Sequence, residues 1–212
     1  MNIHREAFNS YEVNTYLLVA GDRKTIIIDP ACENKAEFAR LEKTIAEKQL
    51  DIVGILLTHA HADHVLGVKF ITDAFPNAQF LIHKEGLSLY ESANDFSLVM
   101  GFKKRELPAP NRFVSDGQEL VFSDITLNAF YTPGHAPGSV CYYAPSDEVV
   151  FTGDVLFHSS IGRTDLPGGS FEILRKSIME KLFTLPDNTL VLPGHGDETT
   201  IGFEKQCNPF LK

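Results

Sequence analysis

The chain has 212 residues, which is long enough for one large domain with a sizeable buried core. Its residues are 43% hydrophobic and 22% charged, a balance that is ordinary for a globular protein and excludes a disordered chain. The formal net charge of −9 argues against a nucleic-acid partner, because proteins that bind a phosphate backbone usually carry a basic face.

The cysteines and the N-terminus indicate the compartment. The 3 cysteines are odd in number and have no paired spacing, so we expect no disulfide framework and a reducing environment. The first ten residues, MNIHREAFNS, contain no apolar run of the kind a signal peptide needs, and no apolar stretch is long enough to span a bilayer. We therefore predict a cytoplasmic protein with no membrane partner, whose oligomeric state is left open.

Strand-like and helix-like segments alternate through the first half of the chain. Apolar residues at helical spacing predict amphipathic helices, and short apolar runs bounded by polar residues predict buried strands. A Gly21-Asp22 turn between two such runs predicts a hairpin. In chain order, this half is predicted to contain strands at 13–19 and 24–28, a helix at 34–48, a strand at 52–57, a helix at 65–75, a strand at 79–83, a helix at 85–100 and a loop at 103–117.

The second half is richer in strands. Ser170 is a suitable N-cap for an amphipathic helix that starts at Phe171. No low-complexity linker divides the chain, so we expect one domain over 1–212, of the α/β class, with two sheets packed face to face and covered by helices. In chain order, this half is predicted to contain strands at 119–130, 139–144 and 148–152, a helix at 171–182, a strand at 189–192 and a short helix at 199–206.

Potential metal ligands are concentrated where the strand at 52–57 ends. The motif THAHADH (58–64) places His59, His61, Asp63 and His64 within six residues, separated by small alanines. Imidazole nitrogens and carboxylate oxygens are the ligands expected for zinc and related divalent metals. A turn would let these side chains converge, so we interpret the motif as the main part of a metal site.

Three further candidates follow glycines at the ends of other strand-like runs. They are His135 in TPGH, Asp154 in FTGD and His195 in LPGH. A tight glycine turn can present a side chain at a sheet edge. Together with the first motif they supply enough ligands for two metals, which can hold a nucleophilic water and polarise a substrate carbonyl. Asp154 comes from a remote segment and is the more natural bridge between the ions.

The motifs THAHADH, TPGHAPGS, FTGDVLF and LPGHG, in this order, resemble the metallo-β-lactamase superfamily and, within it, the glyoxalase II (hydroxyacylglutathione hydrolase) branch. The resemblance covers the chain from about residue 12 to its end. It implies a four-layer αββα sandwich with metals at one edge. It also implies that Asp29, at the end of TIIID, supports the ligands through hydrogen bonds to them.

The resemblance further implies the roles of the candidate residues. The first metal would be held by His59, His61 and His135, and the second by Asp63, His64 and His195, with Asp154 bridging the two. Asp63 and Asp154 would then serve catalysis together with a metal-bound hydroxide. Zinc is the expected metal, and iron and manganese accept the same ligands.

Substrate contacts are less defined by the sequence. In the glyoxalase II branch a lysine and, two residues later, a tyrosine hold glutathione, whereas this chain has Arg163 and Asp165. Arg163 could bind a substrate carboxylate with two donors. The C-terminal helical domain that full-length members use for glutathione is not expected here, since the chain resembles the short glyoxalase II-like hydrolases.

We therefore predict hydrolysis of a small thioester of the hydroxyacylglutathione type by a metal-bridging hydroxide. A persulfide dioxygenase, which resembles this chain in THAHADH and in GRTD, is the first alternative and would use one iron held by His59, His135 and Asp154. A lactonase acting on a cyclic ester is the second. A nucleic-acid-directed or non-enzymatic member of the superfamily is disfavoured by the acidic balance.

Overall fold

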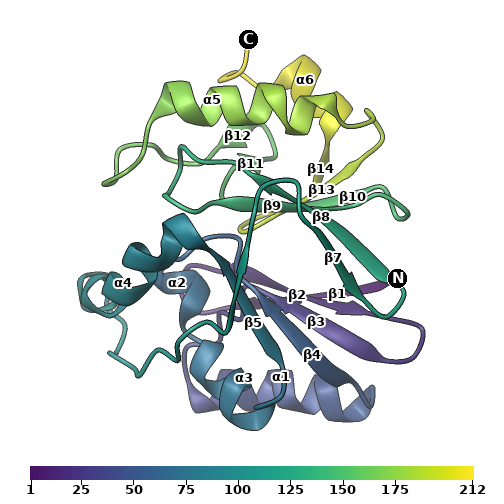
Figure 1. The fold of residues 1–212 in the computed structure, drawn as a ribbon. Coiled ribbons are helices and arrows are strands. Elements are labelled where there is room, and N and C mark those ends of the chain that lie inside the picture. The colour runs from purple at the N-terminus through teal and green to yellow at the C-terminus, as the bar shows by residue number, and fades with distance from the viewer.

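Two β-sheets pack face to face at the centre of the molecule, and helices cover the outer face of each (Figure 1). The computed structural model describes all 212 residues. Helices α1 and α3 lie against one sheet, and α5 and α6 lie against the other, so the chain forms four layers in the order αββα (Figure 1). The predicted fold class is confirmed.

The first sheet places the end of β4 beside the end of β3. Strands β3, β4, β5 and β6 are parallel neighbours, so their carboxyl ends lie at the same edge. Asp29 directly follows β3, and Thr58 lies two residues beyond β4. The sheet has six strands in the order β1 (Asn2–Phe8), β2 (Val13–Val19), β3 (Lys24–Ile28), β4 (Asp51–Leu56), β5 (Gln79–His83) and β6 (Arg112–Val114).

The second sheet brings three further loops to the same edge. Strands β10 and β13 are parallel neighbours, and β8 runs in the same direction because it is antiparallel to β9, which is antiparallel to β10. The loops that follow β8, β10 and β13 therefore emerge together. The strand order is β14 (Thr199–Thr200), β13 (Leu190–Pro193), β10 (Val149–Gly153), β9 (Val140–Ala144), β8 (Ile125–Tyr131) and β7 (Glu119–Phe122).

Helices α1 and α5 begin at residues with capping side chains. Asn34 accepts hydrogen bonds from two backbone N–H groups at the start of α1, and Ser170, the predicted N-cap, accepts one from Ile173 in α5. No helix is both long and apolar enough to cross a membrane. The remaining elements are α1 (Lys35–Glu47), α2 (Ala62–Val65), α3 (Val68–Ala74), η1 (Lys84–Gly86), α4 (Leu87–Val99), β11 (Leu156–Phe157), β12 (Ser160–Ile161), α5 (Phe171–Glu180), η2 (Leu182–Thr184) and α6 (Ile201–Cys207).

Three apolar layers hold the four layers of secondary structure together. Successive side chains of a strand point to opposite faces, and β3 is apolar on both. Ile26 and Ile28 lie between the sheets, whereas Ile27 packs toward the helical side with Leu41 of α1. On the other side, Leu174 of α5 belongs to the layer that covers the second sheet. Burial on both faces explains why the central strands are continuous apolar runs.

Four strand predictions were incomplete. Strand β1 was missed because it is an edge strand whose sequence is largely polar and half-exposed. Strand β6 lies within the predicted loop 103–117 and is a three-residue edge strand. The predicted strand 119–130 is instead the hairpin β7–β8, which turns at Ser123 with φ of 57° and Asp124. The short hairpin β11–β12 was also missed.

Candidate metal centre

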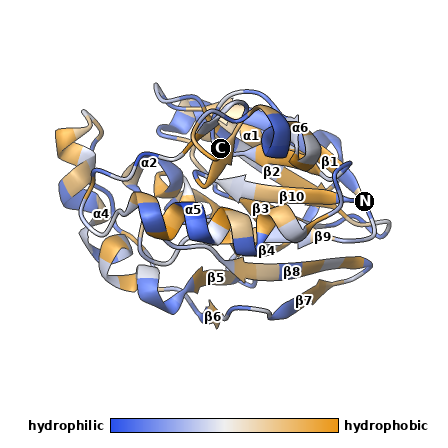
Figure 2. Ribbon diagram, turned by 90° about the horizontal axis from the view of Figure 1, so that it is seen from above, coloured by the Kyte–Doolittle hydropathy of each residue, from blue (hydrophilic) through white to orange (hydrophobic).

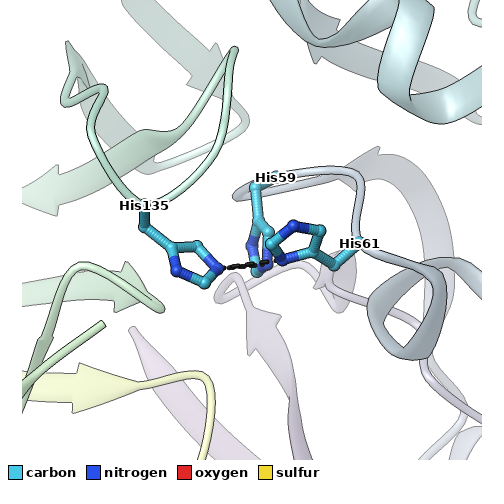
Figure 3. A group of neighbouring side chains, drawn as sticks. All are labelled: His59, His61 and His135. Atoms are coloured by element: carbon cyan, nitrogen blue, oxygen red, sulfur yellow. Dashed lines mark hydrogen bonds between the residues drawn. The ribbon is translucent and has the colours of Figure 1, made fainter. Parts of the chain in front are cut away.

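The first group of candidate ligands joins the loop after β4 to the loop after β8. His135 Nε2 lies 3.3 Å from His59 Nε2 and 2.9 Å from His61 Nδ1. The three rings come from two loops and point toward one another (Figure 3). One nitrogen from each ring lies within 4.8 Å of the other two. Three convergent imidazole nitrogens are a set that a divalent metal accepts.

A second group lies beside the first, at the end of β13. Asp63, His64 and His195 also offer ligand atoms within 4.8 Å of one another. His64 Nε2 lies 3.3 Å from His195 Nε2, which is 3.5 Å from Asp63 Oδ2. Asp63 and His64 belong to the one-turn helix α2.

Asp154 lies between the two groups. Its Oδ2 is 3.7 Å from His135 Nε2 and 3.4 Å from His195 Nε2, and its Oδ1 is 3.4 Å from His64 Nε2. Oδ1 is buried and has no hydrogen-bond partner. A buried carboxylate oxygen without a partner is costly, and a cation would compensate that cost. The donor set and this orphaned oxygen fit a pair of divalent ions.

Electrostatics prepare the first group to bind a cation. Burial lowers the pKa of His59 and of His135, and it lowers that of His61 to about 4, with His135 adding to the effect at His61. All three rings are therefore neutral at pH 7. A neutral imidazole has a free lone pair for a metal, so no proton must be displaced here.

The second group behaves differently because two carboxylates face it. Burial opposes protonation of His64 and His195, but Asp154 and Asp63 outweigh it and raise the pKa of His64 well above its usual value and that of His195 to about 9. Although burial disfavours its charge, the histidines hold the pKa of Asp154 well below its usual range. A cation at this position would replace those protons, so its binding weakens as the pH falls.

Hydrogen bonds to the outer nitrogens orient three of the rings. His135 Nδ1 donates to Arg163 O at 2.8 Å, and His195 Nδ1 donates to Tyr11 O at 2.8 Å. Since a carbonyl only accepts, Nδ1 keeps its proton in both rings, and Nε2 is the nitrogen that can bind a metal. His64 Nδ1 lies 2.9 Å from Asp29 Oδ2 and is fixed in the same way.

Asp29 also fixes the start of the THAHADH motif. Its carboxylate accepts from Thr58 N at 2.7 Å and from Thr58 Oγ1 at 2.6 Å. Its backbone has φ of 49°, a conformation that aspartate tolerates better than most residues. The sequence-based role of Asp29 as a support for the ligands is compatible with this position, whereas Thr58 was not recognised from the sequence.

Two tyrosines of the inter-sheet core were also missed as supports. Tyr142 is fully buried and its hydroxyl donates to Leu57 O at 2.8 Å, just before THAHADH. Tyr16 donates to Pro193 O at 2.7 Å, just before the glycine of LPGH. Each hydroxyl thus holds the backbone immediately before a group of candidate ligands. An isolated tyrosine in an apolar strand carries no sequence signal for this role.

The replacement Asp29→Asn is expected to lower metal affinity 10- to 100-fold, the range typical for a residue that supports a ligand. The amide NH₂ would face the Nδ1–H of His64 and favour the tautomer with its proton on Nε2, which cannot bind metal. Competition with a fluorescent chelator measures the affinity. Asp22→Asn, at an exposed turn, is the matched control, and equal affinities in the two variants would contradict the role of Asp29.

A cavity lies beside the candidate metal centre, and Arg163 is part of its lining. Arg163 lines a cavity of about 800 Å³ that is also lined by His61, Asp154 and His195. Its guanidinium is engaged by Asp165 through Nε at 2.8 Å and Nη2 at 2.7 Å. The cavity connects the candidate metal centre to the surface and can admit a small molecule.

Fold and site together define a class, the metal-dependent hydrolases with an αββα sandwich and histidine–aspartate clusters at one sheet edge. The chain belongs to the metallo-beta-lactamase superfamily, whose family model matches residues 10–195. The predicted membership is therefore confirmed. Membership makes the protein a metal-dependent hydrolase of a superfamily that acts on small molecules.

Relatives and solved structures agree with this assignment. The chain is 40% identical to the probable metallo-hydrolase YqgX of Bacillus subtilis and 35% identical to the hydroxyacylglutathione hydrolase GloC of Haemophilus influenzae, in each case over 100% of this chain and 98% of the relative. TTHA1623 in a di-iron-bound form matches with a TM-score of 0.88 and 36% identity, over 98% of this chain and 100% of its own. ETHE1 from Myxococcus xanthus matches with a TM-score of 0.81 and 30% identity, over 99% of this chain and 84% of its own.

Proposed function

We propose that the protein is a binuclear metallohydrolase that cleaves small thioesters of the hydroxyacylglutathione type. The observation that carries the proposal is the position of Asp154, a buried carboxylate between two groups of ligand-type side chains with one oxygen lacking any partner. The 35% identity to a hydroxyacylglutathione hydrolase supports the substrate type.

In this proposal each residue of the centre has a defined task. Two divalent ions, when bound, polarise the substrate carbonyl and make a shared water acidic. Zinc is the expected metal, and the di-iron form of TTHA1623 supports iron as an alternative. His59, His61 and His135 would hold one ion and Asp63, His64 and His195 the other, with Asp154 lying between the two sets.

The chain's own groups then orient the reactants. Asp63 has a lowered pKa, since His64 and His195 together outweigh the effect of its burial, so its carboxylate is ionised and can accept a hydrogen bond from the attacking water. No thiol competes as a nucleophile inside the molecule. Burial raises the pKa of Cys32 and of Cys141 to about 12, which keeps both protonated.

Metal analysis combined with a turnover assay tests the proposal. We expect about two divalent ions per chain after dialysis, and hydrolysis of S-lactoylglutathione, measured by the release of its thiol. A chelator should abolish turnover, and added zinc or iron should restore it. A preparation that hydrolyses thioesters equally well with and without metal would refute it.

A persulfide dioxygenase is the second candidate, because the chain also resembles ETHE1 at 30% identity and a TM-score of 0.81. His59, His135 and Asp154 would then hold a single iron. One iron per chain, with oxygen consumed in the presence of a thiol persulfide and no thioester hydrolysis, would favour this candidate over the hydrolase.

A further inference from the structure

One wall of the cavity beside the candidate metal centre is a face of helix α4. Leu89, Phe96, Val99 and Met100 line it. Phe96 is 42% exposed and Val99 is 86% exposed, although both are large and apolar. In Figure 2, α4 carries hydrophobic stretches at the edge of the molecule, away from the two sheets. Exposed apolar side chains that gather in a cavity are typical of a binding surface.

This apolar wall packs directly beside the candidate metal centre. Helix α4 packs against α2, which carries Asp63 and His64. Tyr11, which also lines the cavity, contacts Phe102 with ring centroids 5.4 Å apart, and the carbonyl of Tyr11 accepts the hydrogen bond from His195. A ligand whose reacting group lies at the centre would therefore extend along α4.

The charges outside the centre do not favour an anionic ligand at this wall. Arg163 is the basic residue of the lining, and Asp165 already occupies its guanidinium with two hydrogen bonds. Glu85 adds a negative charge to the lining. The hydroxyl of Ser92 is used within α4 itself. A carboxylate at this wall would meet no free cationic side chain outside the centre and would be disfavoured.

We propose that the preferred substrates are thioesters with an uncharged apolar group of several carbons, which packs against α4 through Phe96, Val99 and Met100. The inference rests on the proposed thioester hydrolysis and names a class of thioesters that the enzyme should turn over better than the hydroxyacylglutathione type. Glutathione carries two carboxylates, so it fits this wall less well than an apolar substituent. The apolar group can belong to the acyl part or to the thiol part, and the experiment separates these sources.

Two substrate series test the preference. One keeps the lactoyl group and compares glutathione with the neutral 2-phenylethanethiol as the leaving thiol. The other keeps N-acetylcysteamine and compares acetyl with octanoyl. We expect kcat/KM, corrected for the rate of hydrolysis by free hydroxide, to be at least about tenfold higher for the apolar member of one series, and that series identifies the part that contacts α4.

A matched pair of variants tests the wall. Phe96→Ala is expected to lower kcat/KM for the apolar substrate by about tenfold, mainly through KM, and to lower kcat/KM for S-lactoylglutathione by a smaller factor. Leu98→Ala is the control, since Leu98 lies on the same helix and is 57% exposed but does not line the cavity. Leu98→Ala should leave kcat/KM for both substrates unchanged.

A binding measurement separates failure of this inference from failure of the proposed function. An apolar, non-hydrolysable thioether analogue should bind the wild type and Leu98→Ala with equal affinity in calorimetry, and Phe96→Ala about tenfold more weakly. Equal affinity in all three proteins, or equal kcat/KM within both series, overturns the apolar site. If no thioester is hydrolysed but the analogue binds as expected, the apolar binding site is supported and the proposed thioesterase function is refuted.

Discussion

Replacing Asp154 by alanine is expected to remove bound metal and to lower hydrolysis by a factor on the order of a thousand or more. The carboxylate lies within 3.4–3.7 Å of histidines from both groups, so its removal takes a ligand from both ions. It also removes one of the charges that oppose the effect of burial on His64 and His195. Both ions, rather than one, should therefore be lost.

Metal content by elemental analysis and turnover of a thioester measure this effect in the same sample. Asp73→Ala serves as the control, because Asp73 is an exposed aspartate of α3 that pairs only with Lys69. Asp154→Asn keeps one oxygen and should retain part of the metal. An Asp154→Ala protein that holds two ions and works at the wild-type rate would end the assignment of Asp154 as a bridge.

The structure brings together all the candidate ligands that the sequence singled out, and the reason is topological. Each candidate lies in the segment that follows a strand, and within each sheet the strands concerned run in the same direction, so their ends meet at one edge. Short motifs were therefore sufficient to predict which side chains lie together at this edge. That these residues bind two metals stays a prediction.

The supports of the site could not be predicted in this way. Tyr142 donates to a carbonyl 85 residues away and Tyr16 to one 177 residues away, and neither pair has a local pattern. Similarly, the sequence predicted a helix over 85–100 but not that Phe96 and Val99 face a cavity. The fold decides which face of a helix is left uncovered, and that depends on neighbours distant in the chain.

Gly194 offers the most direct test of how closely the second sheet approaches the candidate centre. Its φ is not in the left-handed region, so alanine is conformationally acceptable there. A Cβ atom, however, would lie 2.3 Å from Asp154 Oδ1 and 2.8 Å from His64 Cε1. The backbone cannot retreat easily, because Gly194 N donates to Gly153 O at 2.8 Å and Gly194 O accepts from Asn14 N at 2.7 Å.

We therefore expect Gly194→Ala to fold but to displace Asp154 or His64, with a loss of metal affinity of about a hundredfold and a parallel loss of turnover. Gly196→Ala is the matched control on the other side of His195. A Cβ there meets nothing within 4 Å, but φ is 71°, so that variant should lose about 1 kcal/mol of stability while keeping its metals. Thermal unfolding and chelator competition separate the two effects. If Gly194→Ala binds metal as tightly as Gly196→Ala does, the close packing of Asp154 against the strand end is not what positions its carboxylate.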